Sequence, residues 1–160
     1  MLSPFLKKLM FARQFFNING KLEILGERNV ILEPDLLLML GKDGYEFGKK
    51  AAKSFFTKYA KKIDLIQNNY ANLMNLLEIL GLGSIKIMKA TQNSATVVVK
   101  DSVEAERYIK SNGRSKSPVC DFTAGFLAGT FSFISKKNTD ARETACNAKG
   151  DASCVFEIKW

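Results

Sequence analysis

The sequence predicts an α+β protein in which one antiparallel sheet, built from N-terminal and C-terminal hairpins, packs against several helices. Short segments that alternate polar and apolar residues, such as residues 21–25, have the period of half-buried strands. Residues 45–63 and 65–80 instead carry apolar side chains three and four positions apart, which is typical of amphipathic helices. Only a few turn-forming residues separate neighbouring strands, and such short connections favour antiparallel hairpins.

The composition indicates a globular protein. A chain of 160 residues favours one domain over residues 1–160, and we find no internal repeat. The net charge of +8 is compatible with nucleic acid, an anionic membrane or an acidic partner, but lysine-rich surfaces also keep proteins in solution. No apolar run approaches the roughly 18 residues of a membrane span. The start of the chain lacks the pattern of a secretory signal, so we expect a cytoplasmic protein with reduced cysteines.

Residues 11–32 predict three short strands. An Asn-Gly pair at positions 19–20 marks the first turn, and residues 21–25 alternate as a half-buried second strand. Residues 26–29 are expected to turn before a third strand at residues 30–32.

A short helix should follow these strands. Pro34 and Asp35 suit its first turn, because proline is tolerated there and acidic groups complement the helix dipole. Residues 36–40 are all apolar, so we expect this helix to be strongly buried. It should end at Gly41.

The helix predicted from Tyr45 has two different faces. Its apolar face consists of Phe47, Gly48, Ala51, Ala52, Phe55, Phe56, Tyr59 and Ile63. Its basic side consists of Lys49, Lys50, Lys53, Lys58, Lys61 and Lys62. The aromatic stripe can line a ligand cavity, but plain core packing is the commoner use of such a stripe. The lysines can bind phosphate groups, although a charged helix face is most often simply solvated.

The middle of the chain predicts a second long helix and a hairpin. Asp64 is a suitable N-cap for a helix over residues 65–80, and glycines after it stop the helix. Residues 84–90 partly alternate and should form a strand. The β-branched segment 95–100 should pair with it and lie centrally in the sheet.

The C-terminal part predicts two helices and a final hairpin. Ser102 is a suitable N-cap for a helix to about Ile109, and a polar loop then leads to a last helix over residues 121–134. Glycine costs about 1 kcal/mol relative to alanine inside a helix, so the small residues of this helix predict a close helix contact. They are Ala124, Gly125, Ala128 and Gly129.

All three cysteines lie in this C-terminal part, and the chain contains no histidine. A soft metal site would therefore use Cys120, Cys146 and Cys154, completed by a carboxylate or water. Gly150 marks a hairpin turn and is equally distant along the chain from Cys146 and Cys154. The two thiols should therefore face each other across the hairpin, close enough to bind one Zn²⁺ ion at about 2.3 Å each.

Glu143 can join the three cysteines only under a geometric condition. It precedes Cys146 by three residues, and in a flat strand this offset puts two side chains on opposite faces. Both can reach one metal only if residues 143–146 turn or bulge. The alternatives are that the cysteines are inert core residues, or that a Cys146–Cys154 disulfide leaves Cys120 unpaired. Redox-active cysteines are a further alternative, although the sequence has no CxxC motif.

The C-terminal pattern resembles the signature of the 4-vinyl-reductase, or hydrocarbon-binding, domain family. The residues that carry the resemblance are Cys120, Gly125, Gly129, Glu143, Cys146, Gly150, Cys154 and Phe156. This family is related in fold to small TRAPP complex subunits and to haem-NO-binding domains. The resemblance implies a structural zinc site formed by Cys120, Glu143, Cys146 and Cys154. Lys149 and Arg142 lie nearby in sequence and could offset its negative charge.

The resemblance also implies a homodimeric module that binds a hydrocarbon or an aromatic ligand, rather than an enzyme. Nucleotide-binding and nucleophile motifs are absent from the sequence. Phenol-responsive members hold the ligand hydroxyl with a histidine, which this chain lacks. Signalling would require a protein partner. The alternatives are a zinc-stapled protein-interaction scaffold without a ligand, and, less favoured, a basic protein that binds nucleic acid through its lysines.

Overall fold

The computed structural model describes residues 33–59 and 80–160 continuously. Outside these ranges it describes three short strands and the single residues Lys7, Met10, Phe11, Met74, Leu77 and Glu78. Most of the helix predicted over residues 65–80 therefore lies outside the described residues. Met74 and Leu77 are helical and buried; the apolar face predicted for that helix included Leu77 but not Met74.

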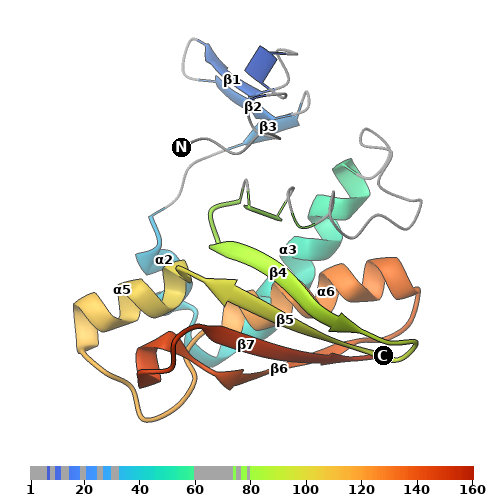
Figure 1. The fold of residues 1–160 in the computed structure, drawn as a ribbon. Coiled ribbons are helices and arrows are strands. Elements are labelled where there is room, and N and C mark those ends of the chain that lie inside the picture. Colours follow the sequence, from blue (N-terminus) through green and yellow to red (C-terminus); the bar gives the residue numbers. More distant parts are fainter. Residues whose placement is uncertain are drawn as a thin grey trace.

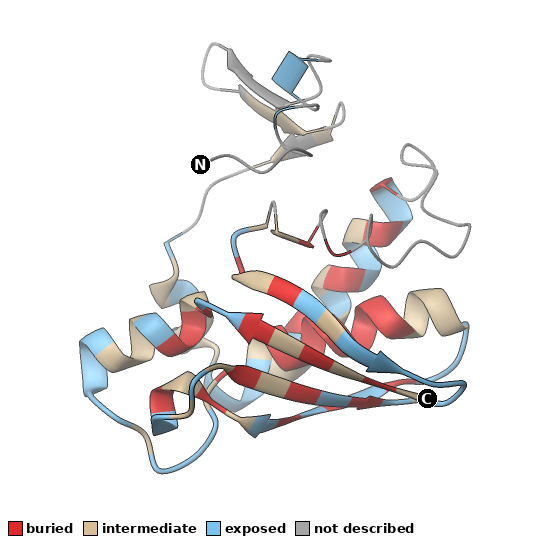
Figure 2. Cartoon of the chain, in the orientation of Figure 1, coloured by how far each residue is buried: buried red, intermediate tan, exposed pale blue. Residues whose placement is uncertain are grey.

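A four-stranded antiparallel sheet forms the centre of the C-terminal part (Figure 1). Its strand order is β4-β5-β7-β6, so that β5 and β7 are the central strands, as predicted for residues 95–100. The bounds are β4 Ser84–Ala90, β5 Ser94–Lys100, β6 Asp140–Ala145 and β7 Cys154–Lys159. Buried residues alternate along β5, β6 and β7, because successive side chains point to opposite faces of the sheet (Figure 2).

Two helices cross behind this sheet, and two more lie beside it (Figure 1). The crossing helices are α3 (Gly44–Tyr59) and α6 (Asp121–Ser135). The others are α2 (Asp35–Met39) and α5 (Val103–Asn112), and the short 3-10 turns are η1 (Gly41–Asp43) and η2 (Asn147–Lys149). This arrangement confirms the predicted α+β class. Among the described residues, no helix is long and apolar enough to cross a membrane.

The N-terminal strands form a separate sheet, and this corrects the prediction of one shared sheet. Its strands are β1 (Phe15–Ile18), β2 (Lys21–Ile24) and β3 (Glu27–Asn29). The strand predicted at residues 30–32 lies outside the described residues, and β3 forms before that position, with Ile24 paired directly with Glu27. Residues 27–29, expected to turn, therefore belong to a strand. In the other sheet the β4–β5 hairpin pairs through β5 with β7, which completes that sheet without the N-terminal strands.

Helix α2 is exposed, contrary to the prediction that it would be strongly buried. None of its residues is buried, and Met39 is 80% exposed. A short helix made almost entirely of leucines is apolar on every side, but only one side can pack against α5. Asp35 at its start forms an ion pair with Arg107 of α5, which attaches α2 to the rest of the molecule.

Helices α3 and α6 approach each other closely through glycine. A Cβ atom on Gly125 would lie 1.9 Å from the Tyr45 carbonyl oxygen, and one on Gly48 would lie 2.2 Å from the Phe122 carbonyl oxygen. The predicted close contact of the small residues is therefore confirmed. The buried stripe of α3 differs slightly from the predicted one, because Phe47 is 51% exposed. It consists of Gly44, Gly48, Ala52, Phe56 and Tyr59.

Candidate metal centre

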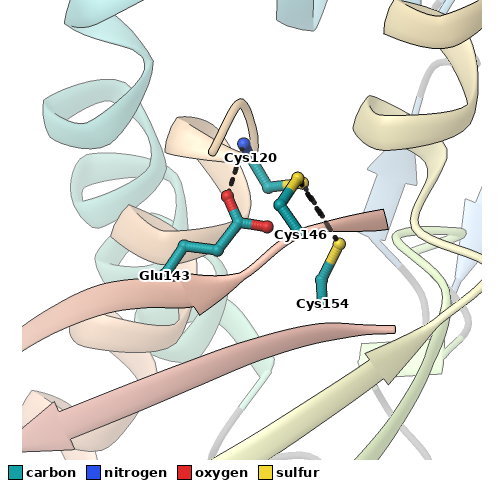
Figure 3. A group of neighbouring side chains, drawn as sticks. All are labelled: Cys120, Glu143, Cys146 and Cys154. Atoms are coloured by element: carbon teal, nitrogen blue, oxygen red, sulfur yellow. Dashed lines mark hydrogen bonds between the residues drawn. The ribbon is translucent and has the colours of Figure 1, made fainter. Parts of the chain in front are cut away.

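The four residues predicted to hold a metal come from three different elements. Cys120 directly precedes α6, Glu143 lies within β6, Cys146 directly follows β6, and Cys154 is the first residue of β7. Figure 3 shows their side chains turned toward one another. We call these four residues the Cys3Glu cluster. One donor atom from each lies within 4.8 Å of the others, and all four residues are buried.

The three sulfur atoms are in mutual contact. Cys120 Sγ lies 3.6 Å from Cys154 Sγ and 4.0 Å from Cys146 Sγ, and the Cys146 and Cys154 sulfurs are 4.0 Å apart. These separations exclude a disulfide in this structure, because an S–S bond is about 2.0 Å long. All three cysteines are free. Four tetrahedral ligands at about 2.3 Å from a zinc ion would lie about 3.8 Å apart, so the observed spacing fits such an ion.

The backbone bends between Glu143 and Cys146, as both side chains require in order to reach one metal ion. The β6–β7 register shifts between Glu143 and Ala145, where the strand contains an irregularity. After this irregularity the chain leaves β6 and enters η2, so Cys146 is not itself a ladder residue. Gly150 ends η2 with a φ of 104°, a conformation that favours glycine. The irregularity and the turn together bring Glu143, Cys146 and Cys154 to one point.

Glu143 uses only half of its carboxylate within the protein. Its Oε2 atom accepts a hydrogen bond of 2.9 Å from the Cys120 backbone N–H, whereas its buried Oε1 atom has no hydrogen-bond partner. Burial raises the pKa of Glu143 to about 7. A buried oxygen without a partner costs about 1–3 kcal/mol, and a metal ion is one group that could satisfy it.

The three thiols influence one another's protonation. Hydrogen bonds from Cys120 and Cys154 stabilise a thiolate on Cys146 and lower the pKa of that residue. Hydrogen bonds to its two neighbours hold the proton on Cys120, and burial adds to the rise in its pKa. The cluster thus favours a negative charge on Cys146, and thiolates are the form in which cysteine binds metals.

Other groups position the four candidate ligands. Ser102 Oγ lies 3.3 Å from Cys120 Sγ and also accepts a hydrogen bond from the Ala105 N–H, which confirms the predicted N-cap of α5. Asp151 accepts a hydrogen bond of 2.8 Å from the Cys146 N–H. The Asn147 N–H points at Cys154 Sγ, 3.4 Å away. These contacts orient the thiols from outside the cluster, as supporting residues of metal sites commonly do.

Glu104 is a supporting residue that the sequence did not single out. It is buried on α5, and its two carboxylate oxygens accept hydrogen bonds from the Phe122 and Thr123 N–H groups at the start of α6. Burial raises the pKa of Glu104 to about 7. Only the acidic first turn of α5 was visible in the sequence, and nothing there distinguishes Glu104 from the exposed Glu106.

The two basic residues expected near the cluster have different positions. Lys149 lies 3.7 Å from Asp151, which in turn contacts the Cys146 backbone, so it is close to the cluster. Arg142 is exposed, whereas its neighbour Glu143 is buried. Adjacent strand residues point to opposite faces, so the Arg142 side chain lies on the face of β6 opposite to Glu143.

The part of the chain that holds this cluster matches a known family. Residues 96–160 match the family model of the 4-vinyl-reductase domain, and this range contains all four cluster residues. The match is confined to this C-terminal range and does not include the residues before it. The resemblance recognised in the sequence is confirmed.

Relatives of this chain occur in Methanocaldococcus jannaschii. The uncharacterised protein MJ0150 is 26% identical over 115 residues, which cover 72% of this chain and 62% of that protein. The uncharacterised protein MJ0855 is 30% identical over 120 residues, which cover 72% of this chain and 48% of that protein. The chain thus spans roughly half to three fifths of the length of these two curated relatives.

Three solved structures share the fold. The phenol-responsive sensory domain of the transcription activator PoxR, solved with phenol, has a TM-score of 0.71 at 18% identity, covering 99% of this chain and 91% of that chain. A vinyl-4-reductase family protein from Methanocaldococcus jannaschii has a TM-score of 0.59 at 22% identity, covering 99% and 96%. A trafficking protein particle complex subunit 3 from Naegleria fowleri, covalently bound to palmitic acid, has a TM-score of 0.50 at 10% identity, covering 81% and 82%. At these identities the comparison establishes the fold alone.

Proposed function

We propose that this chain is a small-molecule-binding module in which one structural Zn²⁺ ion is held by Cys120, Glu143, Cys146 and Cys154. The observation that carries the metal proposal is the buried cluster itself, whose donor atoms lie within 4.8 Å of one another. The unpartnered Glu143 Oε1 supports a fourth ligand at this point. Thiolate-rich sites also bind iron, but zinc is the expected metal for a tetrahedral set of this kind.

The proposed ion would serve the fold rather than catalysis. Three thiolates and one carboxylate complete a four-coordinate shell, which leaves no position for a reactive water. Cys120 would connect the start of α6 to the ion, and Glu143 and Cys146 would connect the end of β6. Cys154 would add the start of β7. Reduced thiols are required for such a site, so we place the protein in the cytoplasm.

The ligand that we propose is a small apolar molecule, either a hydrocarbon or an aromatic compound. Two proteins of the same fold were solved with apolar groups, phenol in one and palmitic acid in the other. The chain has no histidine to bind a phenolic hydroxyl, so we favour a ligand without one. We propose a binding module rather than an enzyme, with a protein partner that receives the signal.

Native mass spectrometry of freshly purified protein tests both parts of this proposal. We expect one zinc ion per chain and, after denaturing extraction, an apolar compound in stoichiometric amount. Protein without metal would contradict the zinc site, whereas zinc without any extractable compound would contradict the ligand.

The Cys146→Ser variant tests the ligand set directly. We expect it to lose its zinc and to unfold at a lower temperature, because a serine hydroxyl does not replace a thiolate. Thr144→Ser is the matched control, since Thr144 is exposed in β6, two residues before Cys146, and contributes no metal ligand. An unchanged zinc content in Cys146→Ser would contradict the four-ligand hypothesis.

A zinc-stapled interaction scaffold is the second candidate function. The observation that favours it is the exposure of large apolar side chains on α2 and the first turn of α3, with Met39 80% and Phe47 51% exposed. Such side chains are typical of interaction surfaces, including the homodimer contact that we propose. Light scattering of the Met39→Ser/Phe47→Ser variant checks this: a dimer that becomes a monomer supports the surface, and an unchanged mass excludes it.

A further inference from the structure

The groove between α3 and α6 has a chemistry that the metal centre does not explain. It encloses about 380 Å³ and is lined by Lys49, Lys50, Lys53, Gly129, Ser132, Phe133 and Lys136. Four of these seven residues are lysines, and none is acidic. A hollow of this size is suited to a small molecule rather than to a single ion.

None of the ion pairs among the described residues involves a groove lysine. They join Arg107 to Asp35 and Lys149 to Asp151, both outside the groove, and the carboxylate nearest along α3 is Glu46, in the first turn of the helix. Four ammonium groups around one hollow repel each other, and a bound anion would relieve this repulsion. The concentration of charge at one point therefore indicates an anionic ligand.

Aromatic rings keep the ammonium groups in place and supply an apolar surface. Lys136 Nζ lies 4.1 Å from the centre of the Phe133 ring, and Lys49 Nζ lies 5.6 Å from the centre of the Tyr45 ring. Phe133 also stacks on the buried Phe56 at 5.0 Å, so its position is fixed by the core. A ligand in the groove would thus meet cations beside a rigid aromatic side chain.

The end of α6 brings a further positive charge to the groove. Lys136 occupies the left-handed C-cap position with a φ of 58°, where glycine is the usual residue. Its backbone N–H bonds to the Ser132 carbonyl oxygen at 3.0 Å and completes the last turn of the helix. A glycine at this position would have no side chain, whereas the Lys136 side chain adds the fourth positive charge to the groove.

We propose that this groove is a binding site for a phosphate ester attached to an apolar or aromatic body. Lysine ammonium groups bind phosphate oxygens as point charges, and the Phe133 ring provides contact for the apolar part. The same chemistry occurs in a soluble aryl or acyl phosphate and in an anionic lipid headgroup. The site is separate from the Cys3Glu cluster and does not depend on the proposed zinc ion.

Isothermal titration calorimetry of the whole chain with 1-naphthyl phosphate at low salt tests the site. We expect saturable one-to-one binding that weakens as salt is added, with 1-naphthol and inorganic phosphate each binding more weakly. The variant Lys49→Ser/Lys53→Ser should bind at least about tenfold more weakly, because two of the four ammonium groups at the groove are lost. Binding to vesicles with and without phosphatidylglycerol tests whether the phosphate belongs to a lipid. A lipid ligand is indicated if only the vesicles with phosphatidylglycerol bind and Lys49→Ser/Lys53→Ser weakens that binding.

The matched control is Lys58→Ser/Lys137→Ser, which removes the same charge from two exposed lysines outside the groove. This variant should bind 1-naphthyl phosphate, or the anionic vesicles, as the unaltered protein does. An equal loss in both variants would show only a general charge effect and would overturn the proposal. The proposal would also be overturned if neither 1-naphthyl phosphate nor the anionic vesicles bind. Tight binding of single-stranded DNA, weakened equally by the groove variant and the control variant, would overturn it as well. Zinc content, measured on the same samples, should stay constant, so this result is independent of the metal proposal.

Discussion

At the residue scale, Glu143 combines a backbone contact with a candidate metal contact. Its Oε2 atom binds the Cys120 N–H, and its Oε1 atom is buried without a partner. The carboxylate therefore both positions a candidate ligand and offers itself as one. Only a buried carboxylate at an irregularity in β6 can do both, because a regular strand would turn Glu143 away from Cys146.

Glu143→Ala should weaken zinc binding less than Cys146→Ser does. Water can take the place of one carboxylate, whereas no nearby group replaces a thiolate. The variant should also lose about 1–3 kcal/mol of stability, because the buried Cys120 N–H loses its acceptor. Zinc affinity measured by competition with a chelator ranks the variants, with Glu157→Ala as the exposed control on β7. A loss for Glu143→Ala equal to that for Cys146→Ser would refute the ranking.

Glu104→Gln should change how stability depends on pH. Burial raises the pKa of Glu104 from 4.5 to about 7, so the folded protein binds this proton more tightly than the unfolded chain does. The resulting stabilisation is fully present below pH 4.5 and is lost as the pH rises through about 7. A shift of this size corresponds to roughly 3 kcal/mol.

Denaturant unfolding between pH 5 and pH 8 measures this effect. The difference in unfolding free energy between Glu104→Gln and the unaltered protein should shift in favour of the variant as the pH rises from 5 to 8. The reason is that glutamine never acquires the buried charge. Glu106→Gln, exposed on the same helix, should follow the unaltered protein. Parallel curves for Glu104→Gln and the unaltered protein would show that Glu104 carries no buried charge at pH 8.

At the scale of elements, the contact between α3 and α6 fixes where the metal centre begins. Cys120 directly precedes α6, and the glycines of the two helices allow their backbones to meet. A Cβ atom on Gly129 would lie 2.7 Å from Ala52 Cβ and 2.8 Å from the Lys49 carbonyl oxygen. Both neighbours are held by α3 and cannot move independently.

Gly129→Leu should therefore lower the free energy of unfolding by about 3 kcal/mol or more, since overpacking outweighs the roughly 1 kcal/mol gained in helix propensity. Thermal unfolding measures the loss. Ser54→Leu, exposed on α3, adds the same side chain away from the contact and should leave the melting temperature nearly unchanged. An unaltered melting temperature for Gly129→Leu would argue that the helices separate easily.

Local signals made many elements predictable, and distant contacts made others unpredictable. Ser102 starts α5 as expected, because an N-cap acts within its own turn. Cys146 and Cys154 also meet near the turn at Gly150, but through η2 rather than as the cross-strand pair that the sequence predicted. By contrast, Glu104 binds backbone groups 18 and 19 residues away, and no local pattern encodes that distance. The exposure of α2 and the separate N-terminal sheet likewise depend on which elements pack together, which periodicity does not specify.

At the scale of the whole molecule, the Cys3Glu cluster brings together parts of the chain that lie far apart in sequence. It brings the start of α6 to the β6–β7 hairpin, and Ser102 and Glu104 add α5 to the same region. The α3–α6 contact lies along the helices and depends on glycine packing instead. The two regions should therefore respond differently to loss of the metal.

Removal of zinc with a chelator should destabilise the end of the molecule that contains the cluster more than the helix crossing. A structural ion adds several kcal/mol to the folded state, and for a chain of this size a loss of that order lowers the melting temperature by about 10 °C. Hydrogen exchange should accelerate first at the backbone amides of Cys120, Cys146 and Asp151, whose acceptors belong to the cluster or its turn. Amides of α6 beside Gly125 and Gly129 should remain protected until global unfolding. Uniform acceleration across both regions would show that the ion stabilises the fold as a single cooperative unit, and no acceleration would show that the cluster is stable as free thiols.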